Sequence, residues 1–245
     1  MIRRAEFQRG FTVVELVIII VTIGILATIA TRQLQPSIET ARFEQTKLEM
    51  EQLAWAIAGN PEVRTSGART DFGYVGDIGA LPATLEVLVS NPASFPNWKG
   101  PYIEPGINGW EYRRDAWGTD YTLSGTVLRS TGSGQTIEKV ICAQAAELTS
   151  NDVRGMLLNA DGSMPGPVWS DSVMLRLIHP NGAGALVASV TAPAPDGSFS
   201  FAGVPVGNHC LQMIYTPSGD TLSYSVCVQP GRTTRVELIS PIDLW

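Results

Sequence analysis

The segment from Phe11 to Thr31 constrains this chain more than any other, because it is predominantly apolar and carries a single charge, Glu15. As a helix that rises 1.5 Å per residue, it would be roughly 31 Å long, which matches the hydrocarbon core of a bilayer. Basic residues before such a segment keep the preceding residues on the cytoplasmic side of a membrane. Three are present here: Arg3, Arg4 and Arg9. The sequence therefore predicts an N-terminal helix that spans a membrane.

Two simpler interpretations of this segment remain open, a cleaved secretory signal peptide and a plain membrane anchor. Basic residues before an apolar run are typical of a signal peptide, and Thr28-Ile29-Ala30 forms a loose cleavage site. Glu15 argues against both, because a carboxylate inside an apolar helix costs about 2.5–3.5 kcal/mol at the helix centre and less near an end. A neutral residue would serve a signal or an anchor better, so Glu15 is expected to have a dedicated partner.

The residues around Glu15 form a recognisable pattern, Gly10-Phe11-Thr12-Val13-Val14-Glu15-Leu16. This pattern resembles the processing signal of type IV prepilins and pseudopilins, in which a short basic leader ends in glycine before an aromatic residue and a glutamate. The resemblance implies cleavage after Gly10 and N-methylation of Phe11 by a prepilin peptidase in the membrane. It also implies that Phe11 and Glu15 take part in assembly, and that an inner-membrane assembly platform and identical or related pilin subunits are partners.

A physical role for Glu15 follows from that interpretation. A helix that packs among identical helices brings its terminal amine into a medium of low dielectric constant, where an unpaired charge is very costly. The Glu15 carboxylate of a neighbouring subunit can neutralise this amine only where the two groups meet. Such a pair would fix the axial register between subunits, as a buried polar residue fixes register in a coiled coil.

Four segments are expected along the chain: a leader at 1–10, a helix at 11–58, a globular head at 59–148 and a β-sandwich at 149–245. Within the helix, residues 11–31 are membrane-spanning, and apolar residues continue at helical spacing from Leu34 to Ile57. Pro36 should kink or interrupt the helix, and Gly59-Asn60-Pro61 should end it. The expected fold class is α+β.

The head contains several motifs in a fixed order. These are Gly76-Asp77-Ile78-Gly79-Ala80-Leu81-Pro82, Trp98-Lys99-Gly100-Pro101-Tyr102, Asp115-Ala116-Trp117-Gly118-Thr119-Asp120-Tyr121 and Ser130-Thr131-Gly132-Ser133-Gly134. Their order resembles the core of the major pseudopilin of type II secretion systems, and with the N-terminus the resemblance covers roughly residues 1–140. That family binds calcium after the last motif, but here only Glu138 lies nearby. Calcium takes six to eight oxygen ligands. No cofactor is therefore predicted and no residue is assigned to a metal, although the family resemblance leaves calcium binding open.

The last hundred residues change in character to short apolar runs separated by Asp-Gly, Pro-Gly and Asn-Gly turns. Seven strands are expected, a pattern typical of a β-sandwich: 153–158, 172–178, 186–190, 198–201, 209–215, 223–228 and 233–238. The run from Asp196 to Phe201, followed by Gly203-Val204-Pro205-Val206-Gly207, resembles carboxypeptidase-regulatory-like (transthyretin-like) domains. That resemblance implies a non-catalytic structural or adhesive module.

Two cysteines are expected to form a disulfide in an exported protein. Cys210 and Cys227 lie in consecutive predicted strands, equally far from the midpoint between Ser218 and Gly219. Directly opposed residues of an antiparallel hairpin have Cβ atoms about 4.5–5.5 Å apart, close enough to bridge with modest adjustment. The alternative is that both are small buried apolar residues, as free cysteines often are. Cys142 is expected to remain a buried thiol.

Several functional classes are disfavoured by the sequence. The net charge of −6 argues against nucleic-acid binding, which needs clustered basic residues. His179 and His209 have no cysteine or histidine at ligand spacing, and no phosphate-binding loop or nucleophile elbow is present. No catalytic residue and no enzymatic activity are therefore predicted.

The expected function is that of a structural subunit of a type IV pilus-like or type II secretion pseudopilus filament. Such a subunit would lie in the inner membrane before assembly and in a periplasmic or cell-surface filament afterwards. The alternative is a membrane-anchored module that binds carbohydrate or protein and does not polymerise. A filament subunit requires Glu15 and cleavage of the leader, whereas a tether requires neither.

Overall fold

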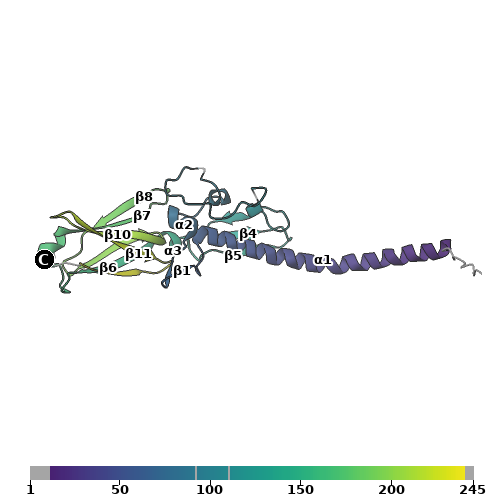
Figure 1. Ribbon diagram of the computed structural model, residues 1–245, viewed down its shortest axis with the longest axis horizontal. Helices are drawn as coiled ribbons and strands as arrows, with labels where there is room; N and C mark the ends of the chain where they lie inside the picture. Colours follow the sequence, from purple (N-terminus) through teal and green to yellow (C-terminus); the bar gives the residue numbers. More distant parts are fainter. Residues whose placement is uncertain (1–11, 92, 110, 241–245) are drawn as a thin grey trace, which may run out of the picture. The chain divides into compact units, whose positions relative to one another are not determined.

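The computed structural model describes residues 12–91, 93–109 and 111–240, with the backbone alone for residues 30–33. Gly10 and Phe11, the predicted processing residues, lie outside the described part. By their contacts, residues 1–45 and residues 46–245 form two compact units. The predicted α+β fold class is confirmed: a long apolar helix comes first, followed by mixed helices and sheets and a β-rich C-terminal part (Figure 1).

Helix α1 runs from Val13 to Ala58 and continues through Pro36 without interruption. It ends where Gly59 adopts a φ of 81° and donates its N–H to the Trp55 carbonyl. A side chain at Gly59 would place its Cβ 2.3 Å from the Asp71 carbonyl oxygen, so only glycine fits this helix end.

The segment from residue 59 to 149 is built from short elements: β1 (Arg64–Thr65), β2 (Ala68–Arg69), α2 (Gly73–Ile78), η1 (Leu85–Leu88), η2 (Glu111–Arg113), β3 (Thr122–Ser124), β4 (Val127–Ser130), β5 (Ile137–Val140) and α3 (Ala145–Thr149). Strands β3, β4 and β5 form one antiparallel sheet. Leu53 and Ile57 of α1 are buried, as are Val75 of α2 and Leu128 of β4. The amphipathic end of α1 thus supplies one side of the core of the head.

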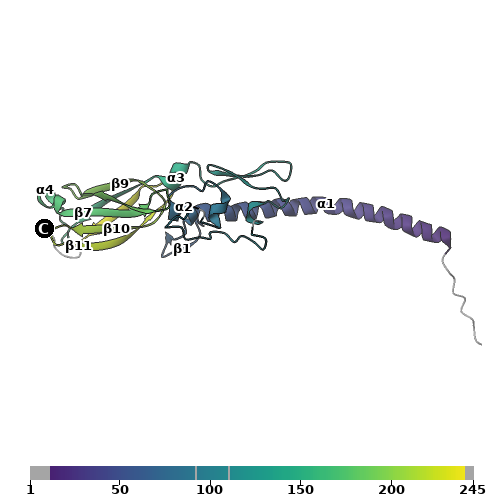
Figure 2. The ribbon, with the colours of Figure 1, turned by 90° about the horizontal axis from the view of Figure 1, so that it is seen from above.

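The seven predicted strands are all present: β6 (Asn151–Leu158), β7 (Val173–Pro180), β8 (Leu186–Thr191), β9 (Ser198–Val204), β10 (Gly207–Tyr215), β11 (Asp220–Val228) and β12 (Thr234–Ile239), with α4 (Gly166–Trp169) and η3 (Ser170–Ser172) before β7. They form two sheets, β11-β10-β7-β8 and β12-β6-β9. Figure 2 shows β7, β10 and β11 side by side. Alternate side chains of both sheets share one core, which includes Leu157, Leu175, Phe199 and Leu211.

The predicted boundary between residues 148 and 149 falls at the end of α3, within the compact unit 46–245. Several backbone hydrogen bonds cross it. The Val206 N–H donates to the Leu148 carbonyl at 2.9 Å, and the Gly182 N–H donates to the Ile78 carbonyl at 2.9 Å. The division into a head and a β-sandwich stays a prediction about how these parts fold separately.

The predicted register of the β10–β11 hairpin is wrong by two residues. Cys210 lies opposite Ser225, and Cys227 lies opposite Asn208, so the two cysteines are diagonal neighbours rather than a facing pair. Gly219 closes the turn with a φ of 78° and donates to the Tyr215 carbonyl, which moves the midpoint of the hairpin to Pro217-Ser218. Diagonal positions are about 7–8 Å apart, too far for a disulfide without backbone movement. All three cysteines are free thiols in this structure, and each is partly exposed.

Candidate functional site

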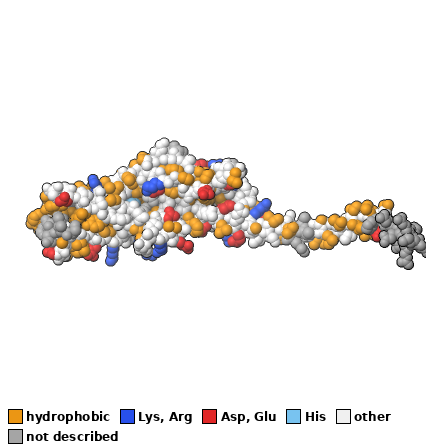
Figure 3. Space-filling view, viewed as in Figure 1, with side chains coloured by type: hydrophobic (Ala, Val, Ile, Leu, Met, Phe, Trp, Pro, Cys, Tyr) orange, Lys and Arg blue, Asp and Glu red, His pale blue; other side chains and the backbone are white. Residues whose placement is uncertain are grey.

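The first half of α1 presents an apolar surface that no other described part of the chain covers. Every large apolar side chain from Val13 to Ile29 is exposed, with exposed fractions that range from 42% at Ile19 to 79% at Val13. Within the described residues, α1 is the one helix that is long and apolar enough to cross a membrane. Figure 3 shows these hydrophobic side chains along the helix. Lipid or the apolar faces of other helices would cover such a surface.

Glu15 lies in the first turn of α1 and takes part in a reciprocal cap. Its backbone N–H donates to the Thr12 hydroxyl at 3.2 Å, and its carboxylate accepts the Thr12 N–H at 3.4 Å. This arrangement is a capping box, which satisfies two of the free N–H groups at a helix start. Sequence reasoning missed this role, although a threonine followed three residues later by glutamate is the signal for it.

Asp115, the first residue of one head motif, is a buried carboxylate that organises two loops. One oxygen accepts the N–H groups of Trp117 at 3.0 Å and Thr119 at 2.9 Å, and the other accepts the Ser130 hydroxyl at 2.6 Å and the Gly132 N–H at 3.1 Å. The side chain of Asp115 thus fastens the β4–β5 turn to the loop that precedes β3. Any Cβ at position 132 would lie 2.4 Å from this carboxylate, which explains the glycine.

Side chains of α1 attach the same hairpin region to the helix. The Thr46 hydroxyl accepts the Ala116 N–H at 3.2 Å, and the Tyr121 hydroxyl donates to the Glu49 carboxylate at 2.7 Å. Burial, together with the hydrogen bond to Glu49, raises the pKa of Tyr121 above its usual range. These contacts fix the head on the C-terminal part of α1.

A second carboxylate, Asp77 in the GDIG segment, joins α2 to the Trp-Lys-Gly-Pro-Tyr motif. Lys99 lies 2.8 Å from one oxygen of Asp77, and the Tyr102 hydroxyl donates to the other at 2.8 Å. Burial and this hydrogen bond raise the pKa of Tyr102. The indole N–H of Trp98 donates to the Val87 carbonyl at 2.8 Å. The Asp77 side chain therefore holds the two motifs together.

The end of α1 is capped by a buried arginine that the sequence did not single out. The Arg69 guanidinium donates to the carbonyl groups of Ala58 and Gly59 and, at 2.7 Å, to the Asp71 carbonyl, and it lies 4.9 Å from the centre of the Phe72 ring. A cation at the C-terminus of a helix satisfies its free carbonyls and its dipole. Arg69 thereby secures the junction between α1 and the rest of the unit.

The two histidines meet where α2 contacts β7 and β10. Their ring centres are 6.2 Å apart, and both side chains are buried. His179 bonds to the Pro180 carbonyl and to the Ser189 hydroxyl, and His209 bonds to the Pro205 carbonyl at 2.8 Å. Burial, with a smaller contribution from His179, lowers the pKa of His209. Both histidines hydrogen-bond only to uncharged groups in the described part of the chain, as side chains with a structural role do.

Acidification should weaken the fold through His209. Its folded-state pKa is depressed, so its stabilising contribution is complete above the unfolded pKa of about 6.5 and is lost as the pH falls below that value. We expect urea unfolding of the detergent-solubilised chain, followed by tryptophan fluorescence, to show a lower midpoint at pH 5.5 than at pH 7.5. His209→Gln, which keeps a donor for Pro205, should reduce this difference. An equal difference in both proteins would contradict the assignment to His209.

The region after the last head motif is held by contacts within the chain. Glu138, the nearby acid after the last head motif, pairs with Arg129 at 2.6 Å. In the described part of the chain, no three His, Cys, Asp or Glu side chains come together as metal ligands would. The Asp115 carboxylate accepts a hydrogen bond from the Gly132 N–H in this turn. The turn is thus held by a carboxylate of the chain itself.

No protein-family model matches this chain. The chain is 26% identical over 134 residues to the "Type II secretion system core protein G" of Xanthomonas campestris pv. campestris (strain ATCC 33913), a match that covers 54% of this chain and 76% of that protein. Among solved structures, it matches "Structure of the Streptococcal ancillary pilin" with 15% identity and a TM-score of 0.24, over 51% of this chain and 40% of that one. Over about half of its length, this chain is therefore similar in sequence, at a low level of identity, to a core protein of type II secretion systems.

Proposed function

We propose that this chain is a structural subunit of a filament of the type II secretion pseudopilus or type IV pilus kind. The observation that carries the proposal is the first half of α1, an apolar surface with a carboxylate, Glu15, in its first turn. The similarity to a type II secretion core protein supports the same conclusion. The subunit would lie in the inner membrane before assembly and in a periplasmic or cell-surface filament afterwards.

The proposed assembly step exchanges lipid contacts of α1 for contacts with the α1 helices of neighbouring subunits. An inner-membrane assembly platform would draw the subunits out of the membrane after a prepilin peptidase has cleaved the leader and methylated Phe11. The new amine of Phe11 would then meet the Glu15 carboxylate of a neighbour. Two opposite charges 4 Å apart attract by about 4 kcal/mol at an effective dielectric constant of 20, so this pair can select one register.

Two substitutions at Glu15 separate its roles in capping and in charge pairing. Glu15→Gln keeps the capping box, because glutamine also accepts the N-cap N–H, but removes the charge. We expect Glu15→Gln to be inserted and processed normally, and to give filament yields at least tenfold below wild type, as should Glu15→Ala. Sheared surface or periplasmic fractions, examined by immunoblot and negative-stain microscopy, measure the yield.

The control is Glu39→Gln, which removes the same charge from an exposed position of α1 beside Arg42. It should leave the filament yield near that of wild type. Normal yields from Glu15→Gln and low yields from Glu15→Ala would assign Glu15 to capping alone. Normal yields from both Glu15 variants would remove the charge-pair step from the proposal and favour a membrane-anchored binding module.

A further inference from the structure

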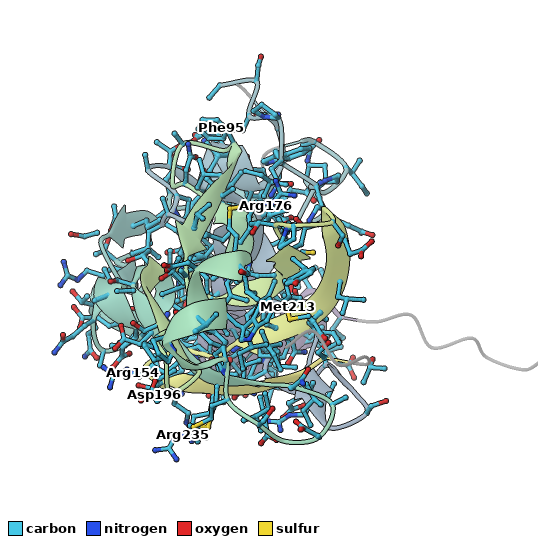
Figure 4. The ribbon with its side chains drawn as sticks, turned by 90° about the vertical axis from the view of Figure 1, so that its left-hand side faces the viewer. Phe95, Arg154, Arg176, Asp196, Met213 and Arg235 are labelled. Atoms are coloured by element: carbon cyan, nitrogen blue, oxygen red, sulfur yellow. The ribbon has the colours of Figure 1, made fainter. Side chains whose placement is uncertain are left out.

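The outer faces of the two sheets of the β-rich part differ in charge. On the β12-β6-β9 sheet the outward positions carry exposed polar and charged groups, among them Arg154, Ser200, Arg235 and Glu237, beside the apolar Met156 and Ile239. Figure 4 shows Arg154 and Arg235 toward one side of the unit and Arg176 toward the other. A polar outer face is the usual arrangement for a sheet that has one side in water.

The outer face of β7, β8 and β10 carries a single charge, Arg176, and the polar side chains of Asn208 and Gln212. Its outward positions carry five large apolar side chains, which we call the apolar β-face: Met174, Ile178, Leu186, Val190 and Ile214. None of them is buried, and the exposed fractions of Leu186 and Val190 are 54% and 55%. The side chains that alternate with them on the same strands, such as Leu175, Leu177 and Met213, already fill the core. The apolar β-face is therefore additional to what the fold needs.

One charge lies in the middle of this face. Arg176 stands between Val190 and Gln212 in the strand register, and its Nε donates to the Gln212 amide oxygen at 2.8 Å. Among the described residues, no carboxylate lies within ion-pair distance of Arg176, in contrast to Arg154, which pairs with Asp152 at 3.0 Å. The face thus consists of apolar side chains around one cation that forms no ion pair. A partner for it should present an apolar side chain next to a carboxylate.

The size of the face limits the kind of partner. Three strands spaced about 4.8 Å apart and five residues of about 3.4 Å along each give on the order of 200–300 Å². A stable, independent interface needs about 800 Å² on each partner. An occupant of the apolar β-face must therefore be held nearby by another interface, which raises its effective concentration. A neighbouring copy that packs through α1 meets this condition.

The chain itself carries a suitable complement on the head. Ile107, at the tip of the loop before η2, has an exposed fraction of 98%. Its N–H donates at 3.2 Å to the carboxylate of Glu111, which is also exposed. Within the described part of the chain Glu111 forms no ion pair, and its carboxylate accepts the Asn108 side-chain amide at 2.7 Å. An apolar tip with a carboxylate at its base matches an apolar face with a cation at its centre.

We propose that the apolar β-face of one subunit receives the Ile107 loop of a second copy, with Glu111 of that copy facing Arg176. This inference rests on the proposed filament function, because α1 packing supplies the proximity. The contact joins two different surfaces, so it can repeat from copy to copy and extends an open filament where the rotation between copies does not close a ring. Such a heterologous contact is the type that an open filament needs, and it adds to the contacts between α1 helices.

The test is site-specific photo-crosslinking of the full-length chain in cells, with benzoylphenylalanine introduced at Val190. A matched control position is Ile239, an aliphatic residue on an outer strand of the other sheet with an exposed fraction of 51%. Position Ile20 on α1 reports the proposed helix packing. We expect adducts between copies from positions 190 and 20 but not 239, and the adduct from 190 should map to the peptide that contains Ile107.

A charge reversal tests the central pair. Arg176→Glu should lower the 190 adduct roughly tenfold and leave the position 20 adduct unchanged, whereas Arg235→Glu on the opposite face should change neither. Self-adducts at position 20 without one at 190, or a 190 adduct with another protein or another surface, would overturn the inference and leave the filament proposal standing. Failure of self-adducts at both positions would overturn both proposals.

Discussion

Asp115→Ala is expected to lower the free energy of unfolding of the unit 46–245 by about 3–5 kcal/mol. The Asp115 side chain is buried and accepts hydrogen bonds from Trp117, Thr119, Ser130 and Gly132. Removal of the carboxylate leaves these donors without their acceptor, and each buried unsatisfied group costs about 1–3 kcal/mol before water or local rearrangement offsets part of the loss. Urea unfolding of the detergent-solubilised chain, followed by tryptophan fluorescence, measures the change.

The chain offers a matched control in the same hairpin region. Asp120 pairs with Arg114 at 2.9 Å on the surface, and its side chain is 64% exposed. Asp120→Ala should change stability by less than about 1 kcal/mol, because exposed ion pairs contribute little. Asp115→Asn should fall between the two, since the amide keeps one acceptor oxygen. Equal effects of Asp115→Ala and Asp120→Ala would show that Asp115 does not organise the two loops.

Much of the β-rich part was predictable because its turns are strongly marked. Asp196-Gly197 illustrates this: Gly197 adopts a φ of 77°, and the Asp196 carboxylate accepts the Ser198 N–H at 2.9 Å. A side chain that hydrogen-bonds two residues ahead, next to a residue that tolerates positive φ, leaves few alternatives to a turn. The strands between such turns were therefore found at nearly their observed bounds.

In the hairpin between β10 and β11, the turn residues do not fix the register of the strands. The segment Thr216-Pro217-Ser218-Gly219 fits more than one turn, and each choice moves every cross-strand pair by one or two residues. The hydrophobic alternation excludes a shift of one residue, which would turn Leu211 and Met213 out of the core. A shift of two residues keeps that alternation, so the pattern of apolar residues could not decide between Ser225 and Cys227 as the partner of Cys210.

In the candidate site, too, contacts between residues close in the sequence could be predicted, whereas contacts between distant residues could not. The Thr12–Glu15 cap is encoded by four consecutive residues and was predictable, although it was missed. The role of Asp115 was not predictable from spacing, because two of its partners, Ser130 and Gly132, are joined to it only by the path of the chain in three dimensions. The apolar β-face was hidden for a related reason: strand alternation does not say which face is covered by a second sheet.

Gly10→Val is expected to abolish processing and therefore filament formation. Our proposal places cleavage between Gly10 and Phe11, so the wild-type chain purified from membranes should lack residues 1–10 and begin with an N-methylated Phe11. A glycine before the cleaved bond lets an enzyme approach the backbone closely, and a β-branched side chain at that position prevents this approach. Intact-mass measurement should find the full-length chain for Gly10→Val, and the sheared fraction should contain none of it.

Gly24→Val is the control for that experiment, because it places the same side chain elsewhere in the apolar segment. Gly24 lies in α1, and a Cβ built there meets no atom within 4 Å outside the adjacent residues and the backbone of its own helix. The variant should be processed like wild type, so any difference from Gly10→Val reports the cleavage position rather than a glycine-to-valine change in a membrane segment. A wild-type mass that begins at Thr31 would identify an ordinary signal peptide, and an intact Met1 would identify a plain anchor. In either case the amine of Phe11 would not exist, and Glu15 would have no charge to pair with at the start of α1.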